Sequence, residues 1–453
     1  MTHRNRRLTA QRNLNPSQLS AGGKGNSLGQ LRLTVERLES RCLPSSGNQS
    51  PSIPIIYPAD GGPPYRPDRI LVRFASATEP KLVSGTSLYR LVPSVPGLYV
   101  IQVNAETNVE TALAAYLQDP GVIYAERDYV VQADRIPNDP LFNQLWGLNN
   151  TGQTGGTPDA DIDAPEAWDV STGGISNSGR GPVIAVIDTG VDYNHSDLIN
   201  KFRRTSSGAV YGWNTLRNNS NANDDNGHGT HVAGIAAAQI NNGVGVAGVA
   251  AWNPAVSGYN AYVQIMPVKV LGASGSGSLS SIANGITWAV NNGADVLNLS
   301  LGGSSGSQTL ANAVAYAWNA GCLIVAAAGN SGSSTPQYPA YYTNCIAVAA
   351  TDSSDRLASF SQYGSWVDIA APGVSILSTY YRNRYAYMDG TSMACPHVAG
   401  AAALVWSNSP WLTNQQLRSI LETNVDPYSP YGTRTIAPGA GRLNVYRALQ
   451  AAN

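Results

Sequence analysis

The chain has 453 residues and a formal net charge of −1, from 28 basic and 29 acidic side chains. This balance lacks the basic excess that marks nucleic-acid binding, so we expect no nucleic-acid partner. Hydrophobic residues make up 43% of the chain, which excludes a wholly disordered protein, and no apolar run of about 18 residues is present to cross a membrane. Charged residues make up only 13%, which predicts a compact domain rich in small residues and turns.

Residues 1–67 lack the features of a folded domain. The first 42 residues carry eight basic side chains and no apolar stretch of the kind that a standard signal peptide needs. The segment 33–45 predicts a short amphipathic helix, and its VERLESR resembles an N-terminal element of some large exported bacterial proteins. A solvated basic tail is the alternative. Residues 44–67 are rich in Pro, Ser and Gly, which favours a linker.

Residues 68–133 predict a small α+β unit. Strand patterns lie at 69–74, 97–103 and 121–131, and 108–119 has apolar residues at helical spacing. A unit of this size is marginally stable alone, so we expect it to depend on the segment that follows.

From residue 137 to residue 453 the pattern changes to strands that alternate with helices. Apolar runs typical of buried parallel strands lie at 182–190, 262–271, 295–303, 322–330 and 345–351. Helical stretches between them lie at 231–240, 278–293 and 310–321. This alternation predicts an α/β fold with a mostly parallel central sheet and helices on both faces. Ligands of such sheets bind at the carboxyl ends of the strands.

Three polar residues stand where such a fold binds ligands. Asp188 ends the strand VIAVID, His228 lies between two glycines in NGHGTH, and Ser392 lies in GTSMACPH at the expected start of a helix. Taken singly, Asp188 is as readily a turn residue, and Ser392 is more readily an N-cap. Together they supply an orienting carboxylate, a base and a nucleophile, in the chain order Asp, His, Ser.

On these motifs the chain resembles the subtilisin-like serine proteases. VIAVIDTGVDYNHSDL, NGHGTHVAG and GTSMACPHVAG match the three active-site motifs of that family, and the resemblance covers about 137–450. It implies that Ser392 is the nucleophile, that His228 is the general base and then the acid, and that Asp188 orients His228. It also implies that Asn330, in AAAGN, forms an oxyanion hole with the backbone N–H of Ser392.

The resemblance also places the substrate. It implies two facing segments that pair with the substrate backbone, and a third that lines the pocket for the residue before the scissile bond. In that order, the segments are Ser300, Leu301 and Gly302; Gly275, Ser276 and Gly277; and Ala327, Ala328 and Gly329. Because the third segment holds only small, uncharged residues, we expect cleavage after medium or large uncharged side chains.

A structural calcium ion is implied by QINNGVGVAG at 239–248, which resembles the calcium loop of the family. The implied donors are hard oxygens, which suit Ca²⁺ better than Zn²⁺ or Mg²⁺. The side-chain ligands are Asp139, Asp197 and Asn242, and the carbonyl ligands are Ile240, Val244 and Val246. An ordinary loop is the alternative at each position.

In this resemblance the unit at 68–133 corresponds to a ferredoxin-like propeptide that acts as an intramolecular chaperone and inhibitor. The family then implies a secreted, monomeric serine endopeptidase that acts on proteins or peptides and processes itself between about Val131 and Pro137. A catalytically silent peptide-binding domain is the competing hypothesis, and the presence of all three triad residues disfavours it. An α/β-hydrolase esterase is excluded because it needs the order Ser, Asp or Glu, His.

The four cysteines, at positions 42, 322, 345 and 395, form no CxxC pair, which disfavours a zinc ribbon or a thioredoxin-like site. Cys322 and Cys345 open apolar runs that read as neighbouring strands, so a disulfide between them is possible. Cys395 is expected to be a small buried residue close to Ser392, the alternative being a thiol that mercurials modify.

Overall fold

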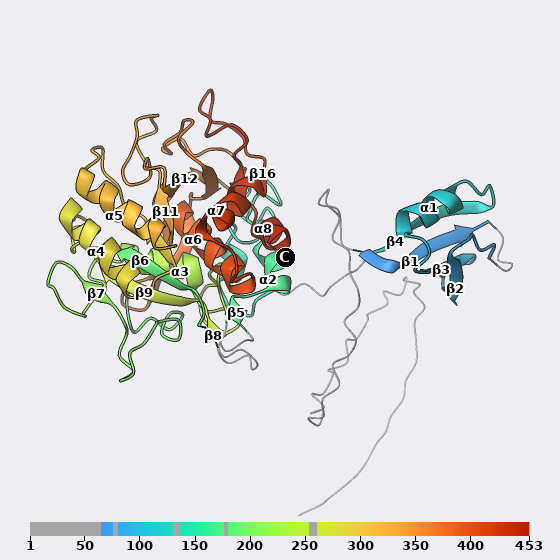
Figure 1. Cartoon of the computed structure of the whole chain (residues 1–453), viewed down its shortest axis with the longest axis horizontal. Helices are drawn as coiled ribbons and strands as arrows, with labels where there is room; N and C mark the ends of the chain where they lie inside the picture. Colours follow the sequence, from blue (N-terminus) through green and yellow to red (C-terminus); the bar gives the residue numbers. More distant parts are fainter. Residues whose placement is uncertain (1–64, 76–79, 130–135, 176–179, 253–260, 453) are drawn as a thin grey trace, which may run out of the picture. The chain divides into compact units, whose positions relative to one another are not determined.

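The computed structural model describes residues 65–75, 80–129, 136–175, 180–252 and 261–452 (Figure 1). It holds a small unit near the N-terminus and a large unit from Ile136 onward, each with its own main sheet. The expected cleavage region between Val131 and Pro137 falls largely outside the described residues. Within the described residues, no helix combines the length and the apolar character needed to cross a membrane.

The small unit is a four-stranded antiparallel sheet with one helix against it. The strand order is β2-β3-β1-β4. The elements are β1 (Tyr65–Phe74), β2 (Thr86–Leu91), β3 (Leu98–Val103), α1 (Val109–Leu117) and β4 (Val122–Tyr129). Alternate residues of β1, such as Ile70 and Val72, are fully buried in one cluster with Tyr116 of α1. The sequence did not predict β2, because four of its six residues are exposed and leave no apolar alternation.

The large unit is built on a nine-stranded sheet in the order β16-β17-β13-β12-β11-β10-β6-β9-β7. All neighbours are parallel except β16 and β17, which are antiparallel. The strands are β6 (Val183–Asp188), β7 (Trp213–Asn214), β9 (Gln264–Lys269), β10 (Val296–Leu299), β11 (Leu323–Ala327), β12 (Cys345–Thr351), β13 (Ile369–Pro372), β16 (Val425–Asp426) and β17 (Arg442–Leu443). Two short antiparallel pairs stand apart: β5 (Gly174–Ile175) with β8 (Ala261–Tyr262), and β14 (Ile376–Tyr380) with β15 (Arg384–Met388).

Helices cover both faces of this sheet, so the predicted fold class is confirmed (Figure 1). Along β6, Ile184 and Val186 belong to one core cluster with α3 and α6, while Ala185 and Ile187 belong to a second cluster with α4 and α5. The helical elements are η1 (Phe142–Gln144), α2 (Ala164–Val170), α3 (His228–Ala237), α4 (Leu279–Asn291), α5 (Gln308–Asn319), α6 (Thr391–Asn408), α7 (Asn414–Thr423) and α8 (Val445–Ala451).

Cys322 and Cys345 are buried free thiols, so the structure contains no disulfide between them. The strand register explains why. Cys345 pairs with Ile324 of β11, while Cys322 precedes that strand and directs its Sγ to the carbonyl of Ala294 at 3.2 Å.

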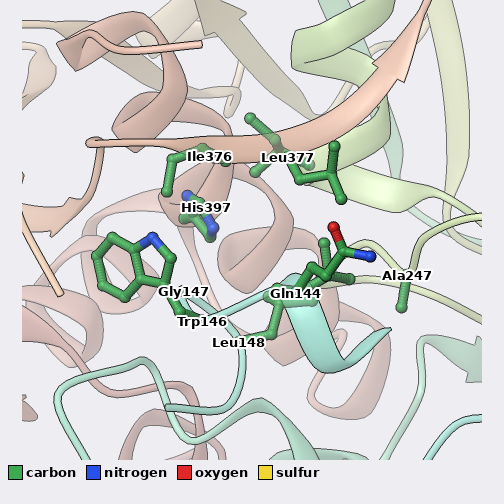
Figure 2. A pocket seen from close by; sticks show the side chains of 10 residues that line it. Gln144, Trp146, Gly147, Leu148, Ala247, Ile376, Leu377 and His397 are labelled. Carbon is green, nitrogen blue, oxygen red and sulfur yellow. The ribbon is translucent and has the colours of Figure 1, made fainter. Parts of the chain in front are cut away.

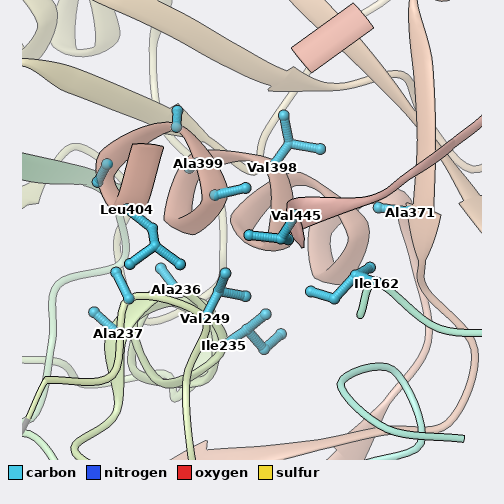
Figure 3. Packing of buried hydrophobic residues seen from close by; sticks show 14 of the residues in the cluster. Ile162, Ile235, Ala236, Ala237, Val249, Ala371, Val398, Ala399, Leu404 and Val445 are labelled. Atoms are coloured by element: carbon cyan, nitrogen blue, oxygen red, sulfur yellow. The ribbon is translucent and has the colours of Figure 1, made fainter. Parts of the chain in front are cut away.

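Small residues bring α3 and α6 into close contact. In Figure 3, Ala236 and Ala237 of α3 lie on the side of α6 from which Leu404 projects. A Cβ atom at Gly400 would lie 2.6 Å from the backbone oxygen of Ala236, so only glycine fits between the two backbones there.

We therefore expect Gly400→Ala to destabilise the fold. Alanine favours a helix by about 1 kcal/mol over glycine, but overpacking of a tight core costs about 1–3 kcal/mol. Because the contact is to rigid backbone, the clash should prevail and lower the midpoint of thermal unfolding. Gly303→Ala is the matched control, since a Cβ there meets nothing within 4 Å. Equal midpoints for both variants would contradict this account of the α3–α6 contact.

Candidate active site

Asp188 and His228 are joined at the carboxyl edge of the sheet. Asp188 is the last residue of β6 and is fully buried, while His228 is the first residue of α3 and its side chain is 21% exposed. Asp188 Oδ1 lies 2.8 Å from Nδ1 of His228 and accepts a second hydrogen bond, of 2.7 Å, from the backbone N–H of Thr189. Because an ionised carboxylate only accepts, Nδ1 carries the proton and Nε2 is left as the basic nitrogen.

The glycines on either side of His228 are required by close contacts. Gly227 has φ +114°, and a Cβ atom there would lie 2.4 Å from the ring of Tyr380. A Cβ atom at Gly229 would lie 2.1 Å from the carbonyl oxygen of Gly190. The turn into α3 can therefore approach β6 only with glycine at both positions.

The surroundings of His228 favour its protonated form. Burial opposes a charge on the imidazole, but the charge and the hydrogen bond of Asp188, with a contribution from Asp224, outweigh it and raise the pKa of His228 above its usual 6.5. The ring is therefore a stronger base than free histidine, and it is neutral only at pH values above that raised pKa.

Ser392 is the second residue of α6 and follows Gly390, whose φ of +149° turns the chain into the helix. Its Oγ donates a hydrogen bond of 3.2 Å to the carbonyl of Ser300. Among the hydrogen bonds of the described residues, none joins Ser392 to His228. The structure thus brings Ser392 to the start of α6 with its hydroxyl directed at the end of β10.

Asn330 lies beside this turn, and its side-chain orientation is set by Thr391. The Asn330 Oδ1 atom accepts hydrogen bonds from the backbone N–H of Thr391 at 2.8 Å and from its hydroxyl at 2.9 Å. The Nδ2 donor of Asn330 therefore points away from Thr391. A Cβ atom at Gly390 would lie 3.4 Å from this Nδ2 and 3.5 Å from the backbone nitrogen of Ser392, so the two donors converge on the space that glycine leaves open.

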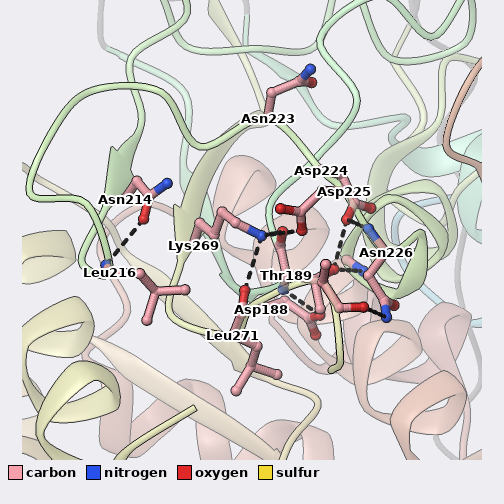
Figure 4. A network of polar contacts seen from close by, with 12 residues as sticks. Asp188, Thr189, Asn214, Leu216, Asn223, Asp224, Asp225, Asn226, Lys269 and Leu271 are labelled. Atoms are coloured by element: carbon pink, nitrogen blue, oxygen red, sulfur yellow. Dashed lines mark hydrogen bonds and ion pairs between the residues drawn. The ribbon is translucent and has the colours of Figure 1, made fainter. Parts of the chain in front are cut away.

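A buried polar network supports the strand end behind Asp188 (Figure 4). Lys269 is 4% exposed, and its ammonium donates to Asp225 Oδ1 at 2.6 Å and to the carbonyls of Thr189 and Leu271 at 2.5 and 2.9 Å. The neighbouring carboxylate, Asp224, accepts hydrogen bonds from the hydroxyls of Thr189 and Thr230 at 2.9 and 2.6 Å. The network fixes the ends of β6 and β9 relative to the turn that carries His228.

The sequence analysis did not identify these supporting residues. Asp224 and Asp225 precede NGHGTH directly, so two adjacent carboxylates beside the histidine were the available signal. Thr189, Thr391 and Lys269 had no comparable signal, because their roles depend on contacts between distant segments.

Two of the three predicted substrate segments line one cleft with His228. The cleft has a volume of about 370 Å³. From the predicted segments it is lined by Gly275, Ser276, Gly277, Ser300, Leu301 and Gly302. Leu271 and Ile282 add apolar side chains, and none of the described residues that line the cleft carries a carboxylate.

The third predicted segment is placed differently. Ala327 and Ala328 are buried in the core, so their side chains do not face a substrate. A Cβ atom at Gly329 would lie 2.6 Å from Cγ of Gln337, and one at Gly302 would lie 3.9 Å from the Gln337 amide oxygen. The Gln337 side chain therefore lies between the two strand ends, at a position that the sequence analysis left unassigned.

Carboxylates at the predicted calcium site gather around one loop. Asp139 accepts backbone hydrogen bonds from Asn241 and Asn242 at 2.8 and 3.3 Å. Asp197 is fully buried and accepts from the Asn242 side chain at 2.9 Å and from the backbone of Val246 at 3.0 Å. Burial raises the pKa of Asp197, and burial together with the charge of Asp197 raises the pKa of Asp139 to about 6.

Cys395 is fully buried, and burial raises the pKa of its thiol to about 12. These properties favour the interpretation as a packing residue over that of an accessible thiol. A second cavity, of about 20 Å³, is lined by Trp146, Gly147, Ile376 and His397 among others (Figure 2). It includes none of the predicted site residues, and burial lowers the pKa of His397 to about 4, so this histidine is neutral at ordinary pH.

Comparison with known proteins gives the family of the chain. Residues 179–444 match the model of the Subtilase family, and residues 51–128 match the Fervidolysin N-terminal prodomain. Thermitase of Thermoactinomyces vulgaris is 47% identical over 315 residues, which cover 69% of this chain and 99% of that protein. The thermophilic serine proteinase of Bacillus sp. (strain AK1) is 46% identical over 343 residues, 76% of each chain.

Solved structures give the same result. A protease from Pseudoalteromonas arctica PAMC 21717 matches with a TM-score of 0.57 and 34% identity, over 70% of this chain and 99% of that one. The matched folds and sequences define a serine endopeptidase with an N-terminal prodomain. The chain belongs to the subtilase family.

The ion pair between Asp188 and His228 predicts how the pKa of His228 responds to a change at Asp188. Asp188→Asn removes the charge that opposes the effect of burial, so the pKa of His228 should fall below 6.5. Histidine NMR titration of the purified protein in a Ser392→Ala background, which prevents self-digestion without placing an inhibitor beside the ring, measures this directly. Asp192→Asn is the matched control, because Asp192 is also buried but makes no hydrogen bond to His228 among the described contacts. An unchanged pKa in Asp188→Asn would refute the assigned cause.

Proposed function

We propose that this chain hydrolyses peptide bonds through a triad of Ser392, His228 and Asp188. The observation that carries the proposal is the 2.8 Å contact between His228 Nδ1 and the buried carboxylate of Asp188, which leaves Nε2 free to take a proton. The Ser392 hydroxyl turns from the Ser300 carbonyl, loses its proton to Nε2 and attacks the substrate carbonyl. As the C–N bond of the tetrahedral intermediate breaks, the imidazolium passes this proton to the leaving amine and an ester to Ser392 remains. Water then gives a proton to Nε2 and attacks this ester, and its breakdown releases the acid and returns the proton to Ser392.

The tetrahedral oxyanion is assigned to two donors, Asn330 Nδ2 and the backbone N–H of Ser392. Support comes from Thr391, which holds the oxygen of the Asn330 amide and so directs its N–H₂ group toward the space beside Gly390. Such preorganised donors stabilise a charge that exists only in the transition state, and loss of one typically costs about 10²–10³ in kcat.

The substrate backbone is assigned to the cleft between Gly275–Gly277 and Ser300–Gly302, as an added strand. The residue before the scissile bond would then meet Gln337, beside Gly302 and Gly329. Because the lining offers apolar side chains and an uncharged amide, the proposal favours uncharged substrate residues. Among the described residues that line the cleft, His228 alone has an ionisable side chain, so no charged partner is provided for a charged substrate residue.

We further propose that the export-related segment with a linker, expected over 1–67, ends where β1 begins at Tyr65. The unit expected over 68–133, together with the start of β1, forms an inhibitory propeptide, and 137–453 form the catalytic domain of a secreted, monomeric enzyme. The prodomain match at 51–128 supports the propeptide. Cleavage between about Val131 and Pro137 would release it.

Ser392→Ala tests the mechanism and the processing together. The variant should lose hydrolysis of a chromogenic peptide by a factor of about 10⁴ or more and should accumulate as the full-length chain, because the nucleophile is absent. Ser407→Ala is the control, since Ser407 is a buried serine of the same helix that donates only to the carbonyl of Leu404. Normal turnover or normal N-terminal processing in Ser392→Ala would overturn the proposal.

A calcium ion fits the residues around Asp139 and Asp197. Both carboxylates are buried, and neither forms an ion pair with a basic side chain of the described ranges. A divalent cation would offset this uncompensated charge. We propose Asp139, Asp197 and Asn242 as side-chain ligands and Ile240, Val244 and Val246 as carbonyl ligands. The ion would tie the start of the catalytic domain to the loop after α3.

Calcium removal should therefore lower the midpoint of thermal unfolding. Loss of an ion present at about 100 times its Kd removes about 2.7 kcal/mol of stability. Asp197→Asn should show a low midpoint that no longer responds to a chelator or to added Ca²⁺. Asp161→Asn is the control, because Asp161 is another buried carboxylate, whose pKa burial raises to about 6. A chelator effect of equal size in Asp197→Asn and Asp161→Asn would contradict the assignment.

A further inference from the structure

Pro396 lies inside α6, four residues after Ser392. In a regular helix the carbonyl of residue 392 accepts a hydrogen bond from the N–H of residue 396, but proline has no N–H and its ring crowds that carbonyl. The freed carbonyl of Ser392 instead accepts a 2.8 Å hydrogen bond from the hydroxyl of Ser300, the residue that follows β10. The backbone of Ser392 is thus held by a side chain of the sheet and not by its own helix.

The hydroxyl of Ser300 has its direction set by a second residue. Asn298 Nδ2 donates a 3.0 Å hydrogen bond to Ser300 Oγ. A serine hydroxyl has one proton. Because the amide occupies an acceptor position of the oxygen, that proton is left to point at the Ser392 carbonyl.

Asn298 is an unusual residue for its position. It is fully buried in β10 at the centre of the sheet, where the other strand residues are apolar. A buried amide is costly unless its hydrogen bonds are made. Here the Oδ1 atom accepts from Cys395 Sγ at 3.3 Å. The amide therefore contacts α6 directly at Cys395 and reaches the Ser392 carbonyl through Ser300.

We propose that Asn298 and Ser300 are positioning residues for the nucleophile, acting through the carbonyl that Pro396 leaves free. The relay from Asn298 to Ser300 to the Ser392 carbonyl fixes the peptide units at the start of α6. This turn presents both the Ser392 hydroxyl and the backbone N–H assigned to the oxyanion. A small tilt of these peptide units would therefore reduce the stabilisation of the transition state more than it weakens substrate binding. The inference rests on the proposed role of Ser392.

A double-mutant cycle between Ser300 and Pro396 tests the relay. Ser300→Ala should lower kcat about five- to tenfold with little change in KM, since one buried hydrogen bond is lost, and Ser300→Thr should restore most of it. In a Pro396→Ala background the backbone N–H of residue 396 can take over the Ser392 carbonyl. There the same Ser300→Ala change should cost twofold or less, an interaction that additive effects would not give.

Asn298→Leu provides the second arm, because leucine is close in size to asparagine but has no polar atoms. It should lower kcat in the wild-type background and cost nothing further when added to Ser300→Ala. Should Ser300→Ala fail to fold, the cycle is run with Asn298→Leu and Pro396→Ala. The rate at which a fluorophosphonate labels Ser392 should follow kcat in every variant, whereas the midpoint of thermal unfolding should not.

Ser407→Ala is again the control for loss of a buried hydroxyl on α6, with kcat expected to be unchanged. Equal costs of Ser300→Ala with and without Pro396, or a kcat that Ser300→Ala leaves unaltered, would overturn the relay. These outcomes are distinct from failure of the proposed function, which would appear as turnover by the wild-type protein that Ser392→Ala does not reduce.

Discussion

The burial of α6 on nearly every side constrains the rest of the large unit. Of its eighteen residues, only Ser392, Trp406 and Asn408 are not buried. A helix surrounded by sheet and helices must be built of small side chains, which accounts for the alanines and the glycine in its centre. Ser392, the second residue of the helix and only partly buried, is therefore held by an element that is packed on nearly every side. Packing of α6 thus fixes the position of Ser392, the proposed nucleophile.

The polar groups around Asp188 are held in place by hydrogen bonds and ion pairs. Ionisable side chains that are buried near the carboxyl edge are paired or hydrogen-bonded, as with Lys269 and Asp224. In a region of low dielectric, each such partner fixes a geometry as well as a charge. The network behind β6 thus holds Asp188 and His228 in position, just as core packing holds α6.

Much of this arrangement followed from local sequence patterns. Continuous apolar strands and intervening helices predicted the parallel sheet, and the carboxyl ends of parallel strands necessarily meet at one edge, which brought Asp188 close to the glycine-flanked His228. These local patterns could not predict contacts between segments that are distant in the chain. The strand β2 is too exposed to show a pattern, the disulfide between Cys322 and Cys345 was ruled out only by register, and Gln337 and Thr391 act through residues far away in the chain. Ala327 and Ala328 were expected from the family resemblance to line a pocket, and the structure buries the side chains of both.

The placement of the lysines has a practical consequence. From residue 136 onward the chain has two lysines, Lys201 and Lys269, which are 0% and 4% exposed and hold backbone carbonyls in the interior. Reagents that acylate amines, or aldehyde supports used for immobilisation, would therefore find no accessible ε-amino group on this unit. With the proposed release from its N-terminal segments, this unit would be modified at a single amine, the α-amino group at its new N-terminus, and would attach to a surface in one orientation.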